Sequence, residues 1–136
     1  MKIKMKNNGS ILIVVVFAIA LLTAFVVGML QLNSEQIQIM KNEIFSAQAN
    51  AIAHAGLADA FSQLRTNSAW RGPATNSNFG GGSYTIIATG TLPNLDVNSI
   101  GISAQGFRAV VDANVTVSAI SPSINIIRID NLRINQ

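Results

Sequence analysis

The chain has 136 residues, a formal net charge of +3 and a charged fraction of only 11%, which leaves room for one small domain and one long additional element. Lys2, Lys4 and Lys6 supply the excess charge, and the rest of the chain carries six basic and six acidic side chains. No later basic run is interleaved with aromatic residues, which argues against nucleic-acid binding. The absence of cysteine excludes disulfides, thiolate metal sites and a cysteine nucleophile.

The first predicted element is an apolar run at residues 11–30, which contains no charge and a single hydroxyl, Thr23. About 20 helical residues span roughly 30 Å, the thickness of a bilayer's hydrocarbon core. The three lysines lie directly before the run, so the positive-inside rule places the N-terminus in the cytoplasm and the rest of the chain outside. We therefore expect a single transmembrane segment.

Three fates are open to such a segment: a discarded secretory signal, a permanent anchor, or an anchor released from its basic leader. Ala18-Ile19-Ala20 has the small-x-small form of a signal cleavage site, but the run exceeds the usual length of about 7–15 apolar residues. Cleavage there would also leave Leu21 to Leu30 as an exposed apolar tail. Gly9-Ser10 favours the third fate, because a flexible glycine ends the leader and a small residue follows it.

Residues 31–64 contain no proline and consist mainly of helix-favouring residues, so we expect one helix over residues 10–64. Its second half is predicted to be amphipathic, with a heptad-spaced apolar stripe that would cover one face of a sheet. The stripe comprises Leu30, Ile37, Ile44, Ala51 and Ala58, with Met40, Ala47 and Phe61 beside it. Gly56, in mid-helix, predicts a position of close packing.

A row of small residues, Ala20, Ala24 and Gly28, follows one side of the apolar run. Small residues at this spacing let membrane helices approach one another closely, so the row is a candidate for helix assembly. The alternative is a coincidence in an alanine-rich anchor.

Beyond the helix, Gly, Pro, Asn and Ser predict a linker loop over residues 65–82, with Gly80-Gly81-Gly82 as a hinge. Residues 83–136 then alternate as strands do, and Pro93-Asn94 and Pro122 mark turns. The expected strands are Ser83–Gly90, Ser99–Gly106, Arg108–Ile120 and Ile124–Ile134. The predicted fold class is α+β, with a long N-terminal helix packed on a small antiparallel β-sheet head.

Taken together, the sequence resembles the type IV pilin-like proteins, in particular the PilX-type minor pilins and the minor pseudopilins. The resemblance rests on Gly9-Ser10 with "SILIVVVFAIALL" behind it, on "ANAIAHAGLADA" at residues 49–60, and on "GGGSYTIIATG" with "SIGISAQG". It implies that residues 1–9 are a leader cleaved off by prepilin peptidase, that the new amine of Ser10 is N-methylated, and that the helix at residues 11–30 assembles with other pilins. It also implies a place in the bacterial inner membrane and then in a fibre, with an extracytoplasmic head.

Three positions depart from that family's pattern. Val14 stands where the major pilins carry a glutamate whose carboxylate neutralises a neighbouring amine, and Gln31 stands where a proline is common. His54 also replaces an acidic residue that is common in the family. The missing glutamate is consistent with a subunit that has no subunit above it, or that is incorporated rarely. We therefore expect a minor subunit that initiates, caps or modulates a pilus, a secretion pseudopilus or a competence filament.

No catalytic constellation is visible, so we expect a protein that is not an enzyme and has no cofactor, metal or small-molecule substrate. His54 is expected to pack in the helix, Trp70 to cover the small core, and Asp96, Asp112 and Asp130 to be solvated charges on separate segments. The main alternative function is that of an uncleaved single-pass protein whose external head binds a partner. A secreted hydrolase would need a nucleophile, a base and an orienting group, which this sequence does not offer.

Overall fold

The computed structural model describes residues 8–121 and 124–135, and the chain forms two compact units that meet between Lys41 and Asn42. One helix, α1 (Asn8–Thr66), runs through both units. The first proline after its start is Pro73, and alanine, leucine and glutamine are frequent along it, so nothing in the sequence interrupts the helical hydrogen bonds. Residues 1–7, 122–123 and 136 lie outside the described part, and with them the three leader lysines and the turn predicted at Pro122.

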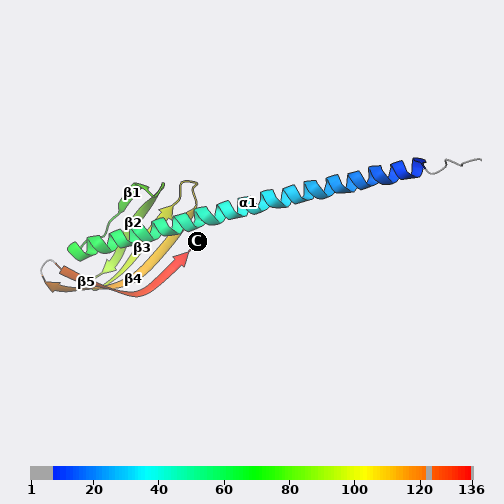
Figure 1. The fold of residues 1–136 in the computed structure, drawn as a ribbon. Helices are drawn as coiled ribbons and strands as arrows, with labels where there is room; N and C mark the ends of the chain where they lie inside the picture. The colour runs from blue at the N-terminus through cyan, green and yellow to red at the C-terminus, as the bar shows by residue number, and fades with distance from the viewer. Residues whose placement is uncertain (1–7, 122–123, 136) are drawn as a thin grey trace, which may run out of the picture. The chain divides into compact units, whose positions relative to one another are not determined.

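The second unit contains a five-stranded antiparallel sheet in which the strands follow one another in chain order (Figure 1). The strands are β1 (Ala74–Phe79), β2 (Gly82–Thr91), β3 (Asn94–Ile102), β4 (Arg108–Ser121) and β5 (Ile124–Asn135). Consecutive strands of opposite direction need only short connections, which accounts for the turns at Leu92-Pro93 and around Gly106. The predicted α+β fold class is confirmed.

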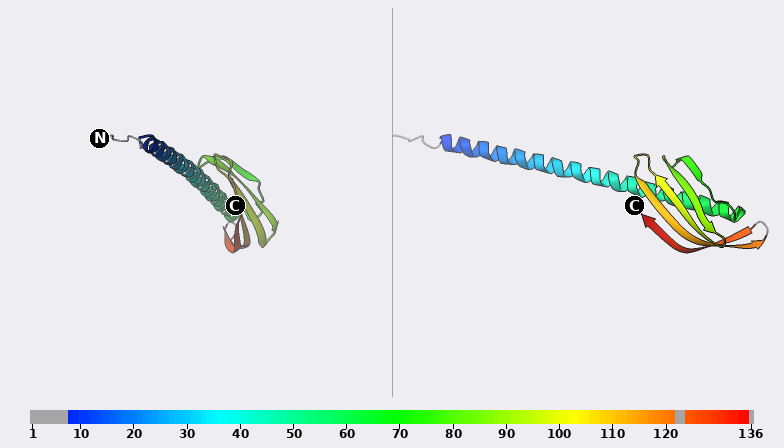
Figure 2. Two further views of the ribbon diagram at one scale, coloured as in Figure 1. Left: turned by 90° about the vertical axis from the view of Figure 1, so that its right-hand side faces the viewer. Right: turned by 180° about the vertical axis from the view of Figure 1, so that it is seen from behind.

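Residues 42–66 of α1 lie across one face of this sheet, as the views of Figures 1 and 2 agree. The core between them consists mainly of alanine, leucine and β-branched side chains, from the helix and from the inner faces of β2, β3 and β4. Its members are Ala49, Ile52, Ala53, Leu57, Ala60, Leu64, Tyr84, Ile86, Ala88, Leu95, Val97, Ala109, Val111, Ala113, Val115 and Val117. Full burial of a side chain such as Leu64 contributes about 1.5–3 kcal/mol.

The helix and β3 approach so closely that their backbones leave no room for a side chain at Gly101. A Cβ atom there would collide with the Ala49 carbonyl oxygen and the Ala53 nitrogen, both of them backbone atoms of the helix. Beside it, the buried Ser99 hydroxyl donates a 2.7 Å hydrogen bond to the Ala53 carbonyl oxygen. Gly56 faces the same strand, since a Cβ atom on it would collide with Ser99 Oγ. The close packing predicted at Gly56 is therefore confirmed.

The apolar stripe predicted to cover the sheet is wrong in its position around the helix. Ile44 is 62% exposed, and Ala51 and Ala58 are exposed as well. The helix instead turns toward the sheet a face that carries Ile52, Leu57 and Leu64 together with small residues at positions 49, 53, 56 and 60. The predicted row took Ala51 and Ala58 from another side of the helix, and the small residues of the buried face allow the close approach to β3.

One further prediction requires correction. The segment predicted as a linker loop, residues 65–82, contains β1, and Gly80 and Gly81 form the turn of the β1–β2 hairpin rather than a hinge. Both glycines have positive φ, the conformation that such a turn demands. The chain divides into its two compact units at residue 41 because the second half of α1 belongs to the core of the head, as predicted.

We expect Gly101→Ala to destabilise the head by about 1–3 kcal/mol, because the new methyl group meets backbone atoms of the helix. Urea unfolding of the full chain in detergent, followed by circular dichroism of the sheet, measures the change. Ala58→Ser, on the exposed side of α1, is the matched control and should change the free energy of unfolding by less than about 0.5 kcal/mol. Equal stability of the two variants would contradict the close contact.

Candidate cleavage site and assembly helix

The apolar residues of the first unit have no partner among the described residues of this chain. Across residues 11–30 the large apolar side chains are between 47% exposed, at Val15, and 70% exposed, at Ile13. Thr23 satisfies its hydroxyl within the helix by donating a 2.8 Å hydrogen bond to the Ile19 carbonyl oxygen. The helix is long and apolar enough to cross a membrane. A helix that is apolar on every side needs lipid or other helices around it.

The predicted cleavage site, Gly9-Ser10, lies in the first turn of α1, and both residues are exposed. A peptidase would therefore meet a helical rather than an extended peptide. This turn is easily opened, because the first four N–H groups of a helix have no partner within it. A Cβ atom on Gly9 would touch nothing within 4 Å, so the fold itself does not require glycine at this position.

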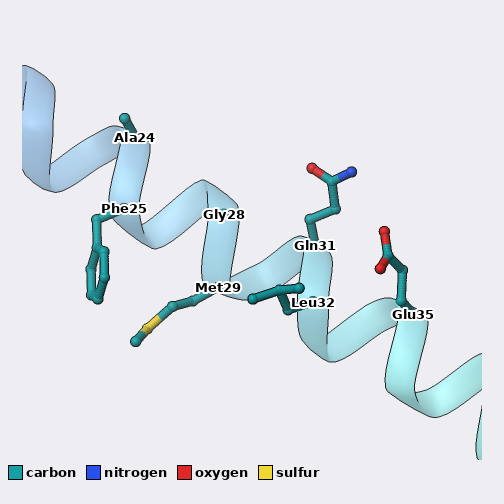
Figure 3. Close-up of a pocket in the computed structure, with 7 residues that line it drawn as sticks. All are labelled: Ala24, Phe25, Gly28, Met29, Gln31, Leu32 and Glu35. Carbon is teal, nitrogen blue, oxygen red and sulfur yellow. The ribbon is translucent and has the colours of Figure 1, made fainter.

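The small-residue row is only partly a groove. Ala24 and Gly28 form part of a hollow of about 530 Å³ on the helix surface, whereas Ala20 does not line it. Phe25 and Met29 border the hollow on one side, and Gln31 and Glu35 extend it toward the end of the unit (Figure 3). The hollow is open because Gly28 has no side chain and Ala24 has only a methyl group.

The outer face of the sheet, away from α1, carries a polar array that the sequence analysis missed. Asp96 lies opposite Asn114, and Asn98 lies opposite Asp112, on the paired strands β3 and β4. Asn114 Nδ2 donates to Asp96, and Asn98 Nδ2 donates to Asp112. Asp96 and Asp112 lie on separate segments, as predicted, and the register of β3 and β4 places each opposite an asparagine of the neighbouring strand. The signal was present as polar residues at every second position of both strands, which places them on one face.

This polar array lines a hollow of about 340 Å³, to which β5 contributes Arg133. Asp130, also on β5, accepts a 2.5 Å hydrogen bond from Thr116 and a 2.7 Å ionic hydrogen bond from Arg128 Nε. The Thr116 hydrogen bond, and then the Arg128 guanidinium, lower the pKa of Asp130 below its ordinary value. Each of the three aspartates, Asp96, Asp112 and Asp130, therefore accepts a hydrogen bond from a side chain of a neighbouring strand.

The other singled-out residues have structural positions. Trp70 is partly buried and packs against the core, as predicted. His54 is half-buried on α1. Among residues 8–121 and 124–135, no three His, Asp or Glu side chains come close enough to hold a metal ion.

Comparison with known protein families, with curated proteins and with solved structures found no match for this chain. The class is therefore defined by architecture alone. A long apolar N-terminal helix packed on a five-stranded antiparallel sheet is a pilin-like architecture.

We expect Thr116→Val to raise the pKa of Asp130, because it removes the hydrogen bond that favours the carboxylate. The folded-state pKa is depressed, so this contribution to stability is present above the ordinary pKa of aspartate and is lost as the pH falls through the folded value. A carbon-detected NMR titration of the Asp130 carboxyl group measures the shift. Thr85→Val, whose hydroxyl bonds Thr75 instead, should leave the Asp130 titration unchanged.

Proposed function

We propose that this protein is a minor pilin or pseudopilin, a structural subunit that helps to initiate, cap or modulate a type IV pilus or a type II secretion-type filament. One observation carries the proposal: the exposed apolar helix continues without a break into the helix that packs on the sheet. A plain anchor needs no such continuity, whereas a subunit that moves from lipid into a filament needs a continuous connection to its head.

In this proposal, prepilin peptidase cleaves between Gly9 and Ser10 at the cytoplasmic face of the inner membrane, and the Ser10 amine is then methylated. The head lies outside the cytoplasm, and the helix associates with those of other pilins. One observation supports the junction: both residues are exposed. They lie in the first helical turn, which must open before cleavage.

The absence of an acidic residue from Ser10 to Ser34 supports a minor rather than a major subunit. A charged amine transferred into an apolar bundle is costly unless a carboxylate lies beside it. Val14 offers no such carboxylate to a subunit above. A subunit at the end of a filament needs none.

An uncleaved single-pass protein with a partner-binding head is the second candidate. One feature favours it. The helix α1 starts at Asn8, so the predicted junction lies within the helix rather than in an extended peptide.

The mature N-terminus decides between the two candidates. In cells that contain prepilin peptidase, we expect intact-mass spectrometry of the purified chain to show loss of residues 1–9 and one added methyl group. Gly9→Ala should abolish the cleavage without disturbing the fold, because a Cβ atom at this position has open space around it. Gly28→Ala is the matched control: it adds the same methyl group to the same helix in equally open space and should be processed normally. A wild-type chain that retains its initiator methionine would exclude the pilin function.

A further inference from the structure

Two faces of α1 in the first unit carry residues at identical spacing, six positions apart in the sequence. The groove face consists of Ala24, Gly28, Gln31 and Glu35, and the ridge face consists of Leu30, Ser34, Ile37 and Lys41. Both sets advance by four, three and four residues, so each follows one side of a helix. All of these residues are exposed.

The two faces differ in relief. The groove face is hollow at Ala24 and Gly28, as Figure 3 shows. On the ridge face Leu30 is 64% exposed and Ile37 is 47% exposed, and both belong to the row that the sequence predicted would cover the sheet. Both side chains remain exposed.

The charges at the ends of the two faces are complementary. Glu35 ends the groove face, and Lys41, which ends the ridge face, is the only lysine or arginine between Ser10 and Leu64. They cannot pair on one helix, where the side chains that meet are three or four residues apart. Among the described residues, the only ion pair is that between Arg128 and Asp130.

We propose that the groove face of one copy of this chain receives the ridge face of a second copy, parallel to it and displaced by six residues, about 9 Å along the helix. This inference rests on the proposed function, which places like helices side by side in one orientation. The displacement sets Leu30 of one copy over Ala24 of the other, and Ser34 over Gly28. It also brings Lys41 to Glu35, beyond the apolar run.

The chain's own complementarity favours a second copy as the occupant. Without a displacement, Glu35 of one copy and Lys41 of the other lie six residues apart along the helix axis. A displacement of six residues in the opposite direction would double that separation. The contact joins two different faces, so a pair of copies keeps one free groove and one free ridge, to which the helices of other pilins can add.

The absence of native cysteine makes the displacement measurable. A chain with Ala24→Cys and a tagged chain with Leu30→Cys are expressed together, oxidised in isolated membranes and separated without reductant. We expect the mixed dimer to form, because the contact brings these two Cβ atoms within disulfide reach. Ala24→Cys paired with Ala18→Cys is the matched control. These two positions would meet only if the second copy were displaced by six residues in the opposite direction, so we expect little mixed dimer from them. Equal yields from the two pairs would overturn the proposal.

Charge exchange tests the same contact independently. Glu35→Lys alone, or Lys41→Glu alone, should lower the yield of the Ala24→Cys and Leu30→Cys dimer roughly two- to fivefold, the range of an exposed ion pair. The double exchange in both copies should restore it. Glu43→Lys, on neither face, is the control. A double exchange that yields no more dimer than the single changes would refute the Glu35–Lys41 pair.

The N-terminal mass of the same samples separates this inference from the proposed function. A chain that is cleaved after Gly9 but does not cross-link from position 24 to position 30 refutes the displacement and leaves the pilin function intact. A chain that cross-links but retains residues 1–9 supports the pairing and refutes the pilin function.

Discussion

The close contact between α1 and β3 is the constraint on which the head depends. Gly101 and Gly56 let the two backbones approach until Ser99 can bond the Ala53 carbonyl oxygen. The inner face of the sheet is covered by this part of the helix, and without it the valines of β4 would lie open to water. Residues 42–66 are therefore a structural layer of the head, not a stalk that ends at it. The division of the chain at residue 41 reflects this contact.

The same helix joins the head to the apolar run. Since α1 continues from Asn8 to Thr66, no loop separates the membrane-compatible segment from the helix that completes the core. A flexible linker at residue 31 would remove that link. Gln31 is instead a good helix former.

Much of this fold could be predicted from the sequence, because the strongest signals in it are local. The apolar run and the strands around Ile86 and Val111 follow from residue type and periodicity alone. The face of α1 that meets the sheet was predicted wrongly, because the row was extended from Leu30 and Ile37, whereas the buried side carries Ile52, Leu57 and Leu64 among its small residues. The strand β1 was missed for a related reason: its Asn, Ser and Thr residues are typical of loops, and pairing with β2 makes them a strand.

For the candidate site, the proposed junction and two residues of the groove face could be named from the sequence, whereas the exposure of the predicted stripe could not. The two helical glycines outside the first turn show why. Each costs about 1 kcal/mol relative to alanine in a helix interior, which a close contact must offset. Gly56 has that contact, because Ser99, Ile86 and Tyr84 surround the place of its missing side chain. Gly28 has nothing within 4 Å in this chain. A glycine in open space is a cost without a compensating contact, so the hollow at Gly28 points to a second helix rather than to any element of its own head.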